Sequence, residues 1–94
     1  MAISRDQAET FALQALGWLA SNDELMPVFL GSSGASVGDL RERASDPVFL
    51  ASVLEFLMMD DAWIVAACDA LRVPYETPQA ARAALPGGEQ VHWT

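Results

Sequence analysis

The sequence contains no lysine, and it has one histidine and one cysteine among its 94 residues. All 5 basic side chains are arginines, which excludes Schiff-base chemistry on lysine and the phosphate-binding loop that requires one. The single cysteine, Cys68, has no partner for an internal disulfide, which is typical of a reducing, cytoplasmic environment. No apolar run reaches the roughly 18 residues of a membrane-spanning helix, and the N-terminus lacks the basic-then-apolar layout of a signal peptide. We therefore expect a cytoplasmic protein with no membrane association.

Positive charge is also scarce. The 13 carboxylates outnumber the 5 arginines and give a formal net charge of −8. An acidic surface is repelled on average by a nucleic acid duplex or an anionic membrane, so we expect neither as a partner. Apolar residues make up 52% of the chain, which excludes disorder for its body. The length fits one domain, and we predict a single helical domain over residues 1–88 followed by a flexible tail over residues 89–94.

Six helix-start signals, each followed by a short apolar stretch, account for nearly all of the chain. Each is a side chain that accepts a hydrogen bond from the first free N–H groups of a helix, followed in some cases by a proline or by a reciprocal acceptor three residues later. The signals lie at Ser4, residues 21–23, Ser36, Asp46, Asp60 with Asp61, and Thr77. They predict helices over about residues 5–20, 23–30, 37–44, 46–59, 62–72 and 78–84, with Gly31 stopping the second and a linker following it.

The predicted helix over residues 46–59 is apolar around most of its circumference. A helix of this kind is buried by other helices, so we place it at the centre of the domain. Short helices with short connectors predict an all-α fold, a compact orthogonal or irregular bundle of five to six short helices. On the preceding helix, Val37, Leu40 and Ala44 share one face and are predicted to be buried.

The reactive residues are isolated. His92 lies in the predicted tail without an anchored neighbour, which catalysis or metal binding would require. Cys68 is followed by Asp69, whose carboxylate would raise the pKa of the thiol, and we interpret the cysteine as a small core residue. Residues 31–36 resemble an anion-binding loop only in glycine and serine content, and a helix end with a linker is the favoured interpretation.

Two further patterns have structural explanations. Asp60 and Asp61 lack the alternating ligand spacing of a calcium loop, and helix capping explains them. Arg41 and Arg43 precede a helix in the manner of a helix-turn-helix, but the second helix presents Phe, Leu, Val and Met, which cannot hydrogen-bond base edges. We therefore predict no enzyme, with no catalytic residue, cofactor or metal site.

The one functional signal is a surplus of large apolar side chains for so small a domain. Methionine and tryptophan are adaptable, high-energy contact residues, and several of them exposed together would form a docking or dimer patch. The candidates are Trp18, Met26, Met58, Met59 and Trp63. The alternative is that these residues simply complete the core.

These observations favour a small acidic module for protein–protein interaction or homo-oligomerisation, with an unknown protein partner or a second copy. The alternative function is a small-ligand-binding or sensory domain. Its pocket would lie between the first, fourth and fifth predicted helices and would be lined by Trp18, Phe56, Met59 and Trp63.

The segment LRERASDPVFL (residues 40–50), then VLEFL (53–57), resembles the central signature of a small alphaproteobacterial family of unknown function, the domain-of-unknown-function family numbered 3572. ALGWLA (15–20) and ARAALPG (81–87) are similar to it as well, so the resemblance covers about residues 5–88. It implies a bacterial, cytoplasmic, stand-alone domain. It brings no known activity, cofactor or partner.

Overall fold

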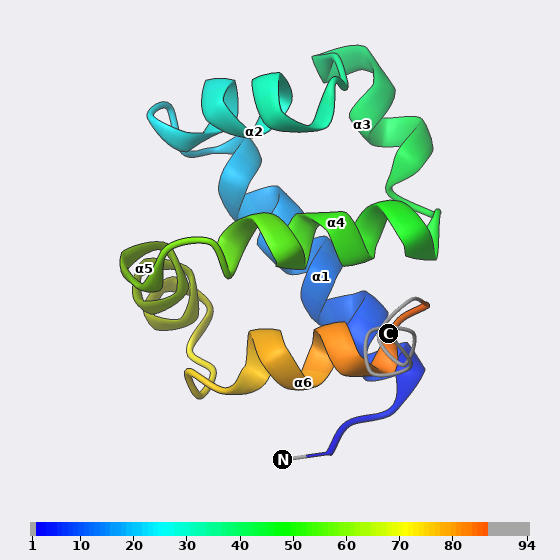
Figure 1. Ribbon diagram of the computed structural model, residues 1–94, viewed down its shortest axis with the longest axis vertical. Helices are drawn as coiled ribbons and strands as arrows, with labels where there is room; N and C mark the ends of the chain where they lie inside the picture. The colour runs from blue at the N-terminus through cyan, green and yellow to red at the C-terminus, as the bar shows by residue number, and fades with distance from the viewer. Residues whose placement is uncertain (1, 87–94) are drawn as a thin grey trace, which may run out of the picture.

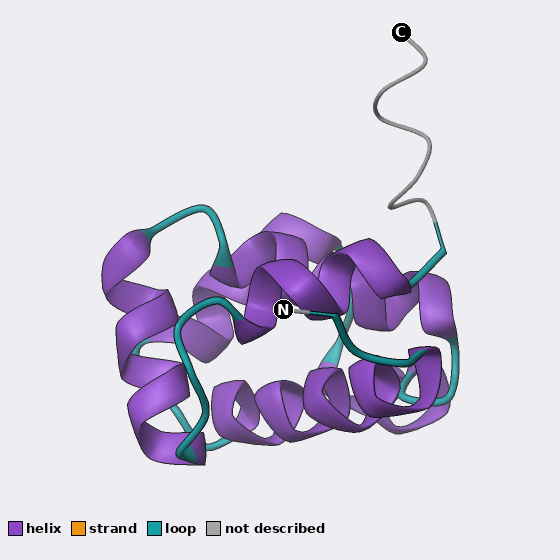
Figure 2. Ribbon diagram, turned by 90° about the horizontal axis from the view of Figure 1, so that it is seen from below, coloured by secondary structure: helices purple, strands orange, loops and turns teal. Residues whose placement is uncertain are grey.

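The computed structural model describes residues 2–86, which form six α-helices joined by short loops, with no strand in this range (Figures 1 and 2). The helices are α1 (Arg5–Ala20), α2 (Leu25–Ser33), α3 (Val37–Arg43), α4 (Pro47–Leu57), α5 (Asp61–Leu71) and α6 (Thr77–Ala84). The predicted all-α bundle is confirmed. The end of the predicted domain at residue 88 and the predicted tail with His92 lie outside the described residues.

Four of the six helices begin at the predicted capping residues. At the start of α1, Ser4 Oγ accepts from the Gln7 N–H at 3.1 Å, and Gln7 Oε1 accepts from the Ser4 N–H at 2.9 Å. This reciprocal pair satisfies two N–H groups that have no partner within the helix. The side chains of Ser36, Asp46 and Asp60 likewise accept backbone N–H groups at the starts of α3, α4 and α5.

The second helix differs from its predicted bounds. The side-chain oxygen of Asn22 accepts from the Leu25 N–H at 3.0 Å, so α2 starts two residues later than predicted. Pro27 falls in the first turn, where its missing N–H costs nothing. The prediction that Gly31 ends the helix was wrong, because the left-handed conformation that closes α2, with φ of 74°, is at Gly34.

The start of α6 also differs. Thr77 is the first helical residue and not the capping residue, and Glu76 precedes the helix without a side-chain cap. The Thr77 N–H donates to the Pro74 carbonyl at 3.0 Å, which closes a turn and brings residue 77 into the helix. Thr77 is only 7% exposed as a result.

The predicted central position of residues 46–59 is confirmed for α4. In Figure 1, α2 and α3 lie on one side of α4, α6 lies on the other, α1 crosses behind it and α5 is seen end-on beyond its C-terminal end. Seven of the 11 residues of α4 are buried: Phe49, Leu50, Ala51, Val53, Leu54, Phe56 and Leu57. Its main helix neighbours are α1 and α6. No helix in the described range is long and apolar enough to cross a membrane.

A row of aromatic rings holds α2 against α4. Phe49 and Phe56 are two turns apart on α4 and therefore share a face. Phe29 of α2 is 1% exposed and packs edge-on to both rings, with centroid distances of 6.0 Å to Phe49 and 5.2 Å to Phe56. At the other end of α4, the Arg43 guanidinium lies 5.8 Å from the Phe49 centroid. These contacts connect α2 and the end of α3 to the central helix.

The burial of α3 was predicted incorrectly at one position. Leu40 is 8% exposed and Ala44 packs against the core, but Val37 on the same face is 66% exposed. The helix has only 7 residues and contacts the body at its C-terminal end. Its first turn therefore extends beyond the surface that Leu40 and Ala44 cover.

Side-chain hydrogen bonds hold α6 against α4 and the loop after α5 against that helix. Arg82 of α6 forms an ion pair with Glu55 of α4, with Nε donating to Oε2 at 2.7 Å, and Arg82 Nη1 also donates to the Pro86 carbonyl at 3.3 Å. After α5, Tyr75 Oη donates to Asp69 Oδ1 at 2.8 Å. This hydrogen bond and the negative charge of Asp69 raise the pKa of the Tyr75 phenol.

Two glycines are expected to respond in opposite directions to alanine. Gly17 lies inside α1, and a methyl group there would meet no atom within 4 Å, so Gly17→Ala should stabilise the fold by about 0.5–1 kcal/mol. Gly34 has φ of 74°, so Gly34→Ala should destabilise it by about 1 kcal/mol. Urea unfolding of both variants measures the two changes. A shift of the same sign in both would contradict the structure.

The Tyr75 contact gives a pH-dependent prediction. Tyr75 is the only tyrosine, so the tyrosinate absorbance titrates a single group. Asp69→Ala should lower its pKa towards the ordinary value, whereas Asp61→Ala, which removes an exposed carboxylate from the other end of α5, should not. Because the folded pKa is raised, the contribution of the bond to stability is present below the pKa of the unfolded chain. It is lost as the pH rises through the folded value.

Candidate interaction surfaces

The single cysteine of the chain lies in the core. Cys68 is 0% exposed, as expected for a core residue. Burial, with smaller contributions from the Asp69 and Glu76 carboxylates, raises the pKa of its thiol, so the thiolate that attacks substrates or metals is disfavoured. Between residues 2 and 86, no three His, Cys, Asp or Glu side chains come together as a metal site would require.

The segment over residues 31–36 has structural roles. Its first three residues complete α2, Gly34 closes that helix, and Ser36 starts α3. The Asp39 carboxylate accepts from the Ser36 N–H at 3.1 Å, which lowers the pKa of Asp39. Asp60 similarly caps α5 by accepting from the Ala62 N–H at 2.8 Å. In both places the polar groups serve the helix ends.

The five residues of the predicted patch divide into two groups. Trp18 of α1 and Met26 of α2 are half-buried and pack against the core. Met58 is the half-buried residue that ends α4, and Met59, which follows it, is 71% exposed. Trp63 is half-buried in the first turn of α5. The structure therefore brings Met58, Met59 and Trp63 to one end of α4, and leaves Trp18 and Met26 on other helices.

The connection between α4 and α5 carries the exposed part of this patch. The Trp63 ring stacks on the Phe56 ring with a centroid distance of 4.8 Å and an interplanar angle of 21°. Phe56 is in turn held by Phe29, so the stacked pair is supported from the core. We call the surface of Met59 and the half-buried Trp63, which rests on the buried Phe56 ring, with the exposed Asp60 and Asp61 between them in sequence, the α4–α5 corner.

A hollow of about 370 Å³ lies beside this corner. Apolar side chains of Phe29, Phe56 and Met59 line it together with three serines and Glu55. It lies between α2 and α4, not between α1, α4 and α5 where the alternative pocket was predicted. Trp18 lines another hollow, with residues 21–24. Of the four residues proposed for the pocket, Phe56 and Met59 line the first hollow, Trp18 lines the second, and Trp63 lines neither.

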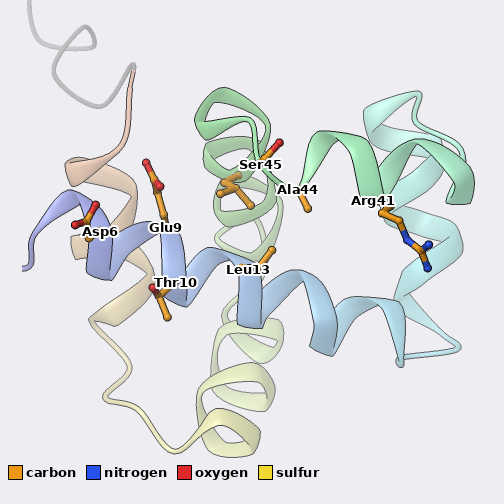
Figure 3. Close-up of a pocket in the computed structure, with 8 residues that line it drawn as sticks. Asp6, Glu9, Thr10, Leu13, Arg41, Ala44 and Ser45 are labelled. Carbon is orange, nitrogen blue, oxygen red and sulfur yellow. The ribbon is translucent and has the colours of Figure 1, made fainter.

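A second surface lies between α1 and the end of α3 (Figure 3). A hollow of about 520 Å³ runs there with Leu13, Ala44 and Leu50 as its apolar lining. Figure 3 shows Asp6 and Glu9 towards one end of the hollow, Arg41 at the other, and Leu13 and Ala44 between them. The remaining lining residues are Thr10 and Ser45. We call this surface the α1–α3 groove.

Sequence reasoning missed the groove, although one signal was available. Asp6, Thr10 and Leu13 recur at helical spacing on the side of α1 opposite its buried residues. Leu13 is therefore an apolar side chain on an outward face, and it is 49% exposed. Arg41 is 28 residues further along the chain than Leu13, and only the tertiary fold places it at the same groove.

Comparisons with known proteins identify the family. A family model described as "Protein of unknown function (DUF3572)" matches residues 5–88. No curated protein and no solved structure matches the chain. The match spans all six helices, from the first residue of α1 to beyond the end of α6. The chain belongs to the DUF3572 family of proteins of unknown function.

Proposed function

We propose that the protein is a non-catalytic docking module that binds a basic, apolar segment of a partner protein at the α4–α5 corner. The observation that carries this proposal is the 71% exposure of Met59, which lines a hollow with Phe56 and lies four residues before Trp63, whose ring stacks on Phe56. A large apolar side chain next to a fixed aromatic surface is the arrangement found at the energetic centre of many interfaces.

The corner offers a rigid surface and an adaptable side chain. Because Trp63 stacks on Phe56 and Phe56 packs on Phe29, a partner pays little entropy to order the rings. Met59 is unbranched and can adjust to the shape of the partner. Its burial in a complex would contribute about 1–2 kcal/mol.

Charge selects the kind of partner. Asp60 and Asp61 are exposed at the corner, and the formal net charge of the whole chain is −8. A negative field steers basic molecules to the surface and opposes acidic ones. The hollow beside the corner adds Glu55, which is already paired with Arg82. An amphipathic segment with lysines or arginines around an apolar stripe therefore matches this surface.

The absence of enzymatic activity and the cytoplasmic, bacterial setting are parts of the same proposal. The support for a reducing compartment is the single, fully buried cysteine. The support for a non-catalytic role is that the buried thiol has a raised pKa, that Asp46 and Asp60 cap helices and that Glu55 is held in an ion pair.

Binding of a defined probe tests the proposal. A synthetic peptide of leucine and lysine at helical spacing should bind the protein in isothermal titration calorimetry, and the same peptide with glutamate for lysine should not. Met59→Gln should weaken the binding about tenfold because it removes an apolar contact at the centre of the corner. Asp61→Lys should slow association and reduce the salt dependence of the affinity.

Val48→Gln is the matched control. Val48 is also an exposed apolar residue, at 64%, but it lies in the first turn of α4, at the other end from Met59. Its substitution should leave the peptide affinity unchanged. Equal losses from Met59→Gln and Val48→Gln, or no binding of the lysine peptide, would contradict docking at the corner.

A further inference from the structure

The α1–α3 groove has the features of a self-complementary surface, and we infer that a second copy of this chain occupies it. In a two-fold symmetric dimer, each copy would place Arg41 against Asp6 of the other, around a central contact of the two Leu13 side chains. This inference concerns a different surface from the α4–α5 corner and does not depend on the proposed docking function.

The centre of the α1–α3 groove is apolar. The buried residues of α1 define its inner face, and Leu13 lies on the opposite side with an exposed fraction of 49%. Ala44 and Leu50 line the hollow with it. Val37 lies one turn before Arg41 on the same side of α3 and is 66% exposed. Leu13 and Val37 are the exposed apolar side chains here, whereas Ala44 is half-buried and Leu50 is buried at the floor of the groove.

The two ends of the groove carry opposite charges. The hollow has carboxylates at one end and a guanidinium at the other (Figure 3). Glu9 already pairs with Arg5, with Nε to Oε2 at 3.1 Å. Asp6 and Arg41 form no ion pair within residues 2–86. Each groove thus offers one acidic and one basic side chain to a partner.

Two-fold symmetry makes a second copy of this chain a partner that fits this arrangement of charges. A two-fold interface uses the same patch on both copies, so that a residue at one end of the patch meets the residue at the other end. A patch with like charge at both ends would repel its copy, whereas this one pairs Asp6 with Arg41 twice. The neighbouring arginine, Arg43, lies over the Phe49 ring, which leaves Arg41 as the basic group of the groove.

The net charge of the chain opposes the binding of a second copy. Two chains of formal charge −8 repel one another, so general electrostatics oppose association and only a local match can favour it. Asp6→Arg separates the two effects, because it removes a pair between the copies while it lowers the general repulsion, whereas Arg41→Glu removes a pair and raises the repulsion.

Sedimentation equilibrium over a range of protein concentrations should show a reversible dimer. Arg41→Glu and Asp6→Arg should each weaken the dimer about tenfold or more. The combined Arg41→Glu/Asp6→Arg variant should recover most of the affinity, because it restores the pairs with their signs exchanged. Leu13→Gln should also weaken the dimer, and circular dichroism should show that all four variants stay folded.

Four outcomes can overturn the inference. Asp6→Arg reduces the net negative charge, so a stronger dimer in this variant would mean that only general repulsion matters. Arg72→Glu changes the net charge as much as Arg41→Glu does, at an exposed residue outside the groove. It should weaken the dimer only through general repulsion, and a loss as large as that of Arg41→Glu would overturn the inference. Loss of the dimer on Met59→Gln would place self-association at the α4–α5 corner. A monomer at every concentration up to about 1 mM would exclude a dimer of useful affinity.

Discussion

The insertion of Phe29 between Phe49 and Phe56 is the constraint on which the outer part of the fold depends. The α2 helix has short connections and few other contacts with α4, and this single buried ring fixes its position along the central helix. The same row continues to Trp63 in α5 and to the Arg43 guanidinium at the end of α3. One line of rings along α4 therefore positions elements of three other helices.

The features predicted from the sequence are those that depend on neighbouring residues. Ser4, Ser36, Asp46 and Asp60 act on N–H groups two or three residues away, and all four start helices as expected. The burial of α4 was predictable for a different reason: a helix that is apolar on nearly every side is stable only where other helices cover it. Local capping and overall hydrophobicity together account for most of the fold.

The remainder depends on tertiary geometry. The helical spacing of Val37 and Leu40 is the same as in a buried pair, but α3 reaches past the surface beneath it and leaves Val37 in solvent. Gly31 is a residue type that often ends a helix, yet α2 continues to Ser33 and ends at Gly34. Met59 was predicted from the surplus of large apolar residues. The placement of Asp6, Leu13 and Arg41 along one groove was not predicted, because it depends on how α1 and α3 lie relative to each other.

Both candidate surfaces lie where the cover of the central helix stops. A helix of 11 residues is about 16 Å long, and Val48 in its first turn and Met59 just beyond its end are both largely exposed. At the C-terminal end the chain turns through Met59 into α5, and near the N-terminal end the loosely packed α3 leaves Leu50 lining an open groove. A larger domain would close these ends with further helices. We propose that the side chains of another molecule cover them, a basic apolar segment at the α4–α5 corner and a second copy at the α1–α3 groove.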